Sequence, residues 1–247
     1  MIQSARFHLG QNNAPLQVLH MVGYHKRSDP ASEYAKAVAD EWKVSQEYGR
    51  LRYIRVTMPP GDWIGGADRP LMTDEPMQPA DLEPMPPGMD EPTARAYDEF
   101  VNYYIHQVNL IRYFLGEEYR LRYADPSGVL LVGESTSGVC VTLEMAPYNT
   151  TMEWHEQVLV AFEKGYVNVN LPAPLARQQA GEVTVMRDNG NGAPVTERPH
   201  MPNRSAMRQQ ASNFIAAVQG EKAAPCAARE ALEDLKIARD YIHMVRG

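Results

Sequence analysis

Residues 102–116 read NYYIHQVNLIRYFLG, which places two asparagines and a histidine among aromatic and aliphatic residues. On an ideal helix of about 3.6 residues per turn, four polar side chains fall within roughly an 80° arc: Asp98, Asn102, His106 and Asn109. Histidine has an ordinary pKa of about 6.5, so it can act as an acid or a base near neutral pH, and a neighbour one turn away can fix its tautomer. The spacing predicts a polar stripe suited to the floor of a substrate cleft.

The same stripe also fits the solvated side of an ordinary amphipathic helix, which is the commoner arrangement. Two features favour a site. The stripe contains no Lys or Arg, and the apolar residues Ile105, Leu110 and Phe114 flank it. Both interpretations stay open on these residues alone.

A second polar cluster, GYHKRSDP at 23–30, contains His25, Lys26 and Arg27 between an expected strand and an expected helix. Loops at such junctions commonly carry ligand contacts, and two cations there suit a hydroxylated or anionic small molecule. A solvated basic turn explains the spacing equally well.

The sequence does not contain the motifs of zinc sites, serine hydrolases or dinucleotide-binding domains. His155 stands beside Glu156, but no second histidine follows one turn later, so no zinc site is expected. The serines lack a Gly-x-Ser-x-Gly setting. The sequence GNGAPV at 190–195 does not open a helix after a strand, so it is no dinucleotide fingerprint. We therefore expect neither a metal site nor a cofactor site in this sequence.

Composition narrows the class of protein. The formal net charge of −7 gives no electrostatic reason to bind nucleic acid or an anionic membrane. Only Cys140 and Cys226 are present, without a Cys-x-x-Cys pattern, so no disulfide framework is implied. No apolar stretch is long enough to span a bilayer, and residues 1–15 do not resemble a signal peptide. A cytoplasmic protein is expected.

The first half of the chain is expected to alternate strands and helices. Residues 16–23 read as an apolar strand, and Asp29 with Pro30 predicts the start of a helix whose buried face carries Tyr34, Val38 and Trp42. A strand at 51–58 follows. Nine prolines in 59–92 predict a long loop, and the central helix is expected from Thr93 to Leu115.

After Gly116 the apolar period changes to alternation, which predicts a mostly antiparallel meander of six strands or so. One of them places Val139, Val141, Leu143 and Met145 on one face. Two helices close the chain. Their apolar residues are Met207, Ala211, Phe214, Ile215 and Val218 in the first, and Leu232, Leu235, Ala238, Ile242 and Val245 in the second. The expected fold is α+β, an open, mostly antiparallel sheet covered by helices on one face.

Four segments resemble, in order, the glucose-fructose oxidoreductase and inositol dehydrogenase (Gfo/Idh/MocA) family: VGYHKRSDPASEYAKAVAD, GRLRYIRV, NYYIHQVNLIRYFLG and MRQQASNFIAAVQGEKAAPCAAREALEDLKIARDYI. In that family an N-terminal Rossmann domain binds NAD(P), and a C-terminal domain binds the substrate and mediates oligomerisation. The resemblance implies that residues 1–23 are a remnant of the end of a Rossmann domain. Residues 24–247, including the Pro-rich loop 59–92, would form the substrate-binding and oligomerisation domain.

The resemblance also implies roles for the polar stripe. The family's central helix carries an Asp, a His four residues later and often another Asp three residues after that, which are Asn102, His106 and Asn109 here. His106 would take the proton from a substrate hydroxyl as hydride leaves for the nicotinamide. Asn102 departs from the pattern because an amide cannot stabilise an imidazolium as a carboxylate does. Asp98 is a hypothetical substitute, and Lys26 and Arg27 would lie near the mouth of the cleft.

Two functions are consistent with these observations. The first is the substrate-binding and dimerising part of an NAD(P)-dependent oxidoreductase acting on a sugar, cyclitol or related polyol. Such a chain would be incomplete as a catalyst by itself and would form a homo-oligomer through the sheet face. Its Rossmann domain would be either upstream in the same reading frame or on a separate partner chain. The alternative is a non-catalytic, stand-alone protein that keeps the fold for assembly or sugar binding.

Overall fold

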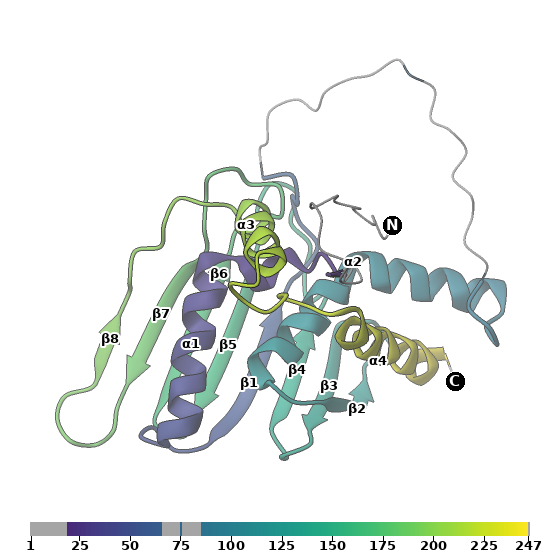
Figure 1. The fold of residues 1–247 in the computed structure, drawn as a ribbon. Coiled ribbons are helices and arrows are strands. Elements are labelled where there is room, and N and C mark those ends of the chain that lie inside the picture. Colours follow the sequence, from purple (N-terminus) through teal and green to yellow (C-terminus); the bar gives the residue numbers. More distant parts are fainter. Residues whose placement is uncertain (1–18, 66–74, 76–84, 247) are drawn as a thin grey trace, which may run out of the picture.

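The computed structural model describes residues 19–65, 75 and 85–246, and one sheet with helices on its near face organises them (Figure 1). The helical elements are η1 (His25–Ser28), α1 (Pro30–Ser45), α2 (Glu91–Leu115), α3 (Ala206–Val218) and α4 (Ala228–Arg246). The strands are β1 (Leu51–Thr57), β2 (Tyr119–Ala124), β3 (Leu130–Ser135), β4 (Cys140–Glu144), β5 (Glu156–Phe162), β6 (Gly165–Leu171), β7 (Glu182–Arg187) and β8 (Val195–Glu197).

The strands form one open sheet in the order β2-β3-β4-β1-β5-β6-β7-β8. Every neighbouring pair is antiparallel except β1 with β4, whose parallel register sets Ile54 opposite Val141. The predicted α+β fold, an open and mostly antiparallel sheet with helices on one face, is therefore confirmed. The sequence did not predict β8, whose three exposed residues pair with β7 beyond the turn at 187–194.

Helix α1 begins as its sequence predicts. The Asp29 carboxylate accepts a hydrogen bond from the Ala31 amide at 2.8 Å, with Pro30 at the first helical position. The helix buries Val38 and Trp42 and packs on β6 and β7. Asp29 also accepts from the Gly181 amide at 2.9 Å, so the helix start is tied to the loop before β7.

Helix α2 crosses the sheet and is covered by α4 (Figure 1). It begins two residues before the expected Thr93, because the Asp90 side chain caps it by accepting from the Thr93 amide. Gly116, with φ 74°, ends it in the left-handed conformation that glycine adopts without strain. Its residues Leu110, Ile111 and Phe114 are fully buried, so α2 is the central helix of the core.

Two sequence-based predictions about elements are wrong. The described part of the expected 16–23 strand, residues 19–23, has no strand structure; residues 16–18 lie outside the described part of the chain. The apolar stripe of α3 faces outward, with Met207, Ile215 and Val218 between 43% and 56% exposed.

Hydrogen bonding explains the orientation of α3. Its buried side carries Asn213, whose amide nitrogen lies 3.0 Å from the Ser28 hydroxyl and 2.7 Å from the Glu33 carboxylate. Turning the apolar stripe inward would leave these polar groups without partners. In α4 the apolar face expected from helical spacing is largely buried. Ala238 and Ile242 are buried, but Leu232 is 51% exposed.

Candidate functional site

The structure brings the two predicted polar clusters together. Element η1 lies against α2, so that the His25 ring meets the His106 ring edge-on at a centroid distance of 4.8 Å. The Tyr24 ring also meets the His106 ring edge-on, at a centroid distance of 5.6 Å. His106 is half-buried, whereas His25 is buried. A site centred on His106 would therefore be built from η1 as well as from α2.

Lys26 reaches a buried carboxylate. Its ammonium lies 2.6 Å from Glu156 Oε2 and 3.2 Å from the Pro172 carbonyl oxygen, and it stands 5.4 Å from the centre of the Trp154 ring. Lys26 is only 3% exposed and Glu156 1%. The interpretation of residues 23–30 as a solvated basic turn is therefore wrong, because η1 is buried.

Glu156 has two further hydrogen-bond donors. The Gln107 amide donates to Oε1 at 2.7 Å, and the Trp154 indole donates to Oε2 at 3.2 Å. Sequence reasoning considered Glu156 only as a metal ligand and missed its pairing. A signal was present: Glu156 is in phase with Val158, which is buried on the helix side of β5, so it is an acidic residue on an apolar face.

Burial controls the protonation of the two histidines. It lowers the pKa of His106 from 6.5 to about 4; the Glu156 carboxylate opposes this effect and the Lys26 ammonium adds to it. Burial, His106 and Lys26 together lower the pKa of His25 to about 3. Both imidazoles are therefore neutral at pH 7. His106 Nδ1 and His25 Nε2 are buried without a hydrogen-bond partner among the described residues.

Arg27 and Asn109, predicted to contact substrate, bind the protein itself. Arg27 pairs with Glu230 and donates to the Pro225 carbonyl at 2.8 Å. Asn109 is fully buried and donates to Asp234 Oδ2 at 2.7 Å. These contacts fasten η1 and α2 to α4 and the segment before it, which is a structural role.

Asn102 and Asp98 lie on the exposed side of α2. No hydrogen bond joins Asn102 to His106 within the described residues, although the two side chains are one turn apart. The predicted stripe is thus divided: His106 is half-buried against η1, Asn109 is fully buried, and the other two face outward.

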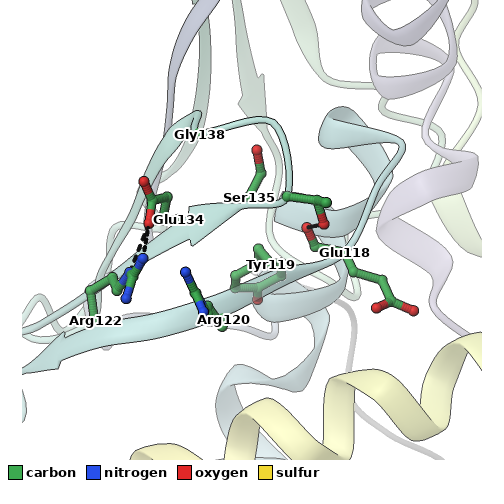
Figure 2. Close-up of a pocket in the computed structure, with 8 residues that line it drawn as sticks. Glu118, Tyr119, Arg120, Arg122, Glu134, Ser135 and Gly138 are labelled. Carbon is green, nitrogen blue, oxygen red and sulfur yellow. Dashed lines mark hydrogen bonds and ion pairs between the residues drawn. The ribbon is translucent and has the colours of Figure 1, made fainter.

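The described residues also form a hollow of about 410 Å³ at the β2–β3 edge of the sheet. Figure 2 shows its side chains, with Arg122 paired to Glu134 on the neighbouring strand and Arg120 beside them. His106 does not line this hollow. Within the described ranges, no group of three or more His, Cys, Asp or Glu side chains is placed to hold a metal ion. Those ranges also contain no helix with the length and apolarity that a membrane span needs.

No protein-family model and no curated protein matches the sequence. Solved structures do match the fold. A UDP-N-acetylglucosamine 3-dehydrogenase from Acidithiobacillus ferrooxidans aligns with 91% of this chain and 60% of its own, with 14% identity and a TM-score of 0.55. An aldose-aldose oxidoreductase from Caulobacter crescentus, complexed with glycerol, aligns with 92% and 61%, with 14% identity and a TM-score of 0.56.

A 3-ketoreductase from Actinomadura kijaniata, solved with NADP, aligns with 93% of this chain and 60% of its own, with 11% identity and a TM-score of 0.52. The chain thus spans about three fifths of the length of these solved structures. At these identities the likeness concerns the fold. The described structure shares its fold with the aligned part of these oxidoreductases, which is the fold that the resemblance to the Gfo/Idh/MocA family predicted.

Proposed function

We propose that this chain is the substrate-binding part of a cytoplasmic NAD(P)-dependent oxidoreductase acting on a sugar, cyclitol or related polyol, and that it is incomplete as a catalyst alone. The observation that carries the proposal is His106, a neutral imidazole with a buried Nδ1 that has no partner among the described residues. A substrate hydroxyl would satisfy such a nitrogen. The sugar oxidoreductases among the structures of the same fold support the substrate class.

His106 is proposed to accept the proton of a substrate hydroxyl when that carbon is oxidised. Asn102 and Asp98, exposed on the same helix, are proposed to hydrogen-bond further hydroxyl groups at the rim of the site. Lys26 is proposed to act through its charge, because its ammonium already contacts Glu156 and Pro172. Arg27 and Asn109 are then proposed to hold the site's elements in place.

The described residues offer no site for the dinucleotide. No described strand runs through a Gly-x-Gly-x-x-Gly turn into a helix, so this part of the chain does not fit NAD(P). We therefore propose that the dinucleotide site belongs to a Rossmann domain on a separate chain or on further sequence. The outward apolar stripe of α3 supports a covering partner, because its Met207, Ile215 and Val218 lack apolar contacts that a second domain would provide.

A second copy of the chain is proposed to pack on the sheet face that the described helices leave open (Figure 1). This face carries Tyr53, Arg55 and Gln157. Arg55 and Gln157 are joined at 2.8 Å, so the face offers an ordered polar and aromatic surface. Sedimentation velocity at micromolar concentration is expected to give a dimer; a monomeric mass would contradict this proposal.

The alternative function, a non-catalytic sugar-binding or structural protein, is favoured by one observation. Asn102 carries no charge and makes no bond to His106, so the residue one turn before His106 offers no anion to a protonated imidazole. The two functions predict different results for the same variant of His106.

His106→Gln is expected to weaken polyol binding about tenfold, because one hydrogen bond to a buried nitrogen is lost. Saturation-transfer NMR and calorimetric titration against a panel of sugars and cyclitols would measure this. With a Rossmann-domain partner present, NAD(P)-dependent oxidation of the bound polyol is expected to fall at least about a hundredfold.

The matched control is Arg122→Gln, which changes the hollow at the β2–β3 edge and leaves His106 untouched. Binding of no polyol by the wild-type chain would defeat the proposal. Tight polyol binding together with equal oxidation rates in wild type and His106→Gln would favour the non-catalytic alternative.

A further inference from the structure

The charges around His106 come from elements far apart in the sequence. Tyr24 and His25 face its ring from the segment entering η1 and from η1 itself, and η1 also brings the Lys26 ammonium. Strand β5 brings the Glu156 carboxylate, which lies 2.6 Å from that ammonium. His25 is neutral at pH 7, so the charged pair that acts on His106 is Lys26 with Glu156.

We propose that Glu156 is the counter-charge for His106: a positioning residue that stabilises the imidazolium formed when His106 takes up a substrate proton, while Lys26 limits that stabilisation. The inference rests on the proposed function, because it concerns His106 as proton acceptor. It assigns a role in the chemistry to a strand residue that does not itself touch substrate.

The carboxylate of Glu156 is fixed in place. Oε2 accepts from Lys26 and from the Trp154 indole, and Oε1 accepts from Gln107. Gln107 directly follows His106 on α2, so the same turn of helix that carries the imidazole also holds the carboxylate. A fully buried, triply hydrogen-bonded anion cannot turn toward water, and its field is screened less than that of a surface charge.

The acidic residue of the polar stripe on α2 is poorly placed for this role. Asp98 is exposed and two turns away on α2, where water and salt screen its charge. Asn102 is uncharged. The electrostatic directions agree with the geometry: Glu156 raises the pKa of His106, and Lys26 lowers it by less.

A purely structural explanation would have Glu156 serve only to neutralise Lys26. Loss of Glu156 alone leaves the Lys26 charge unpaired and lowers the pKa of His106 under either explanation, so the variant that lacks both charges separates them. Under the structural explanation the pair has no net effect on His106, and Lys26→Met/Glu156→Gln titrates as wild type does. Under the counter-charge proposal the pKa of His106 in this double variant lies below its wild-type value.

The test is an NMR titration of the full chain with ¹³C-labelled histidine, in which His106→Gln identifies the His106 signal. In Glu156→Gln the pKa of His106 is expected to fall by about one unit, because a fixed anion is lost and Lys26 remains. In Lys26→Met/Glu156→Gln the pKa of His106 is expected to lie between its value in Glu156→Gln and its value in wild type. Nitrogen-15 spectra would verify that each variant is folded.

An unchanged His106 titration in folded Glu156→Gln would overturn the proposal. A His106 pKa in the double variant equal to or above that of wild type would overturn it equally, whether or not Glu156→Gln folds. The titration and the oxidation assay are separate measurements, so the counter-charge proposal and the proposed function can fail separately. A shifted titration with normal polyol oxidation in His106→Gln would retain the coupling and reject the role of His106. An unchanged titration together with impaired polyol oxidation in His106→Gln would reject the role of Glu156 and retain that of His106.

Discussion

Replacing Asp234 by asparagine is expected to lower the free energy of unfolding by about 3–5 kcal/mol. The fully buried Asp234 carboxylate accepts from Arg112 Nε and from Asn109 Nδ2, both at 2.7 Å. The substitution leaves the guanidinium of Arg112, itself only 7% exposed, without its counter-charge. Because the carboxylate on α4 joins two residues of α2, its loss acts on the central helix of the core.

Urea denaturation followed by circular dichroism would measure the change. Asp240→Asn on the same helix is the matched control, since Asp240 pairs with Arg239 at the surface, and it is expected to change the free energy of unfolding by at most about 1 kcal/mol. Equal effects of the two substitutions would show that the buried connection between α2 and α4 contributes no more than a surface pair.

Local sequence signals predicted the elements of this fold well. Asp29 with Pro30 identified the start of α1 because a cap acts over three residues, and Gly116 identified the end of α2 because only a left-handed residue fits there. Alternation of apolar residues predicted strands such as β4 because side chains point to opposite faces of a sheet. Each of these signals lies within a few residues of the feature it predicts.

The contacts that local patterns did not reveal depend on distant partners. The apolar stripe of α3 predicted a buried face, but Asn213 on the opposite side binds Ser28 and Glu33, some 180 residues earlier. Asn109 fitted a substrate stripe by its helical spacing, yet its amide binds Asp234, 125 residues later. A helix pattern shows which residues share a side and does not show what that side packs against.

The sequence did not reveal the partners of Glu156 for the same reason. Its hydrogen bond to Lys26 spans 130 residues and its bond to Gln107 spans 49, so no spacing rule connects them. His106 was found because the chemistry of a histidine is evident from its type. The charge acting on it became evident only when η1, α2 and β5 were placed together.

Lys26→Met alone is expected to lower the free energy of unfolding by about 3–5 kcal/mol, because Glu156 then stays buried without its cation. Lys26→Met/Glu156→Gln is expected to cost much less, about 1–2 kcal/mol, since removing both charges also removes the penalty for burying them. Urea denaturation of Lys26→Met, Glu156→Gln and the double variant gives the coupling free energy between the two residues. The exposed pair Arg95–Glu99 on α2 is the control, where little coupling is expected.

The coupling between the two substitutions indicates whether stability explains the ion pair of Lys26 with Glu156. If the double variant is nearly as stable as wild type, the ion pair contributes little to the net stability of the fold, and stability does not explain a charged pair at this position. Its remaining effect is to fix a negative and a positive charge beside His106. A double variant as unstable as Lys26→Met would instead show that the pair is needed for packing η1 on β5, and a structural role would then suffice for both residues.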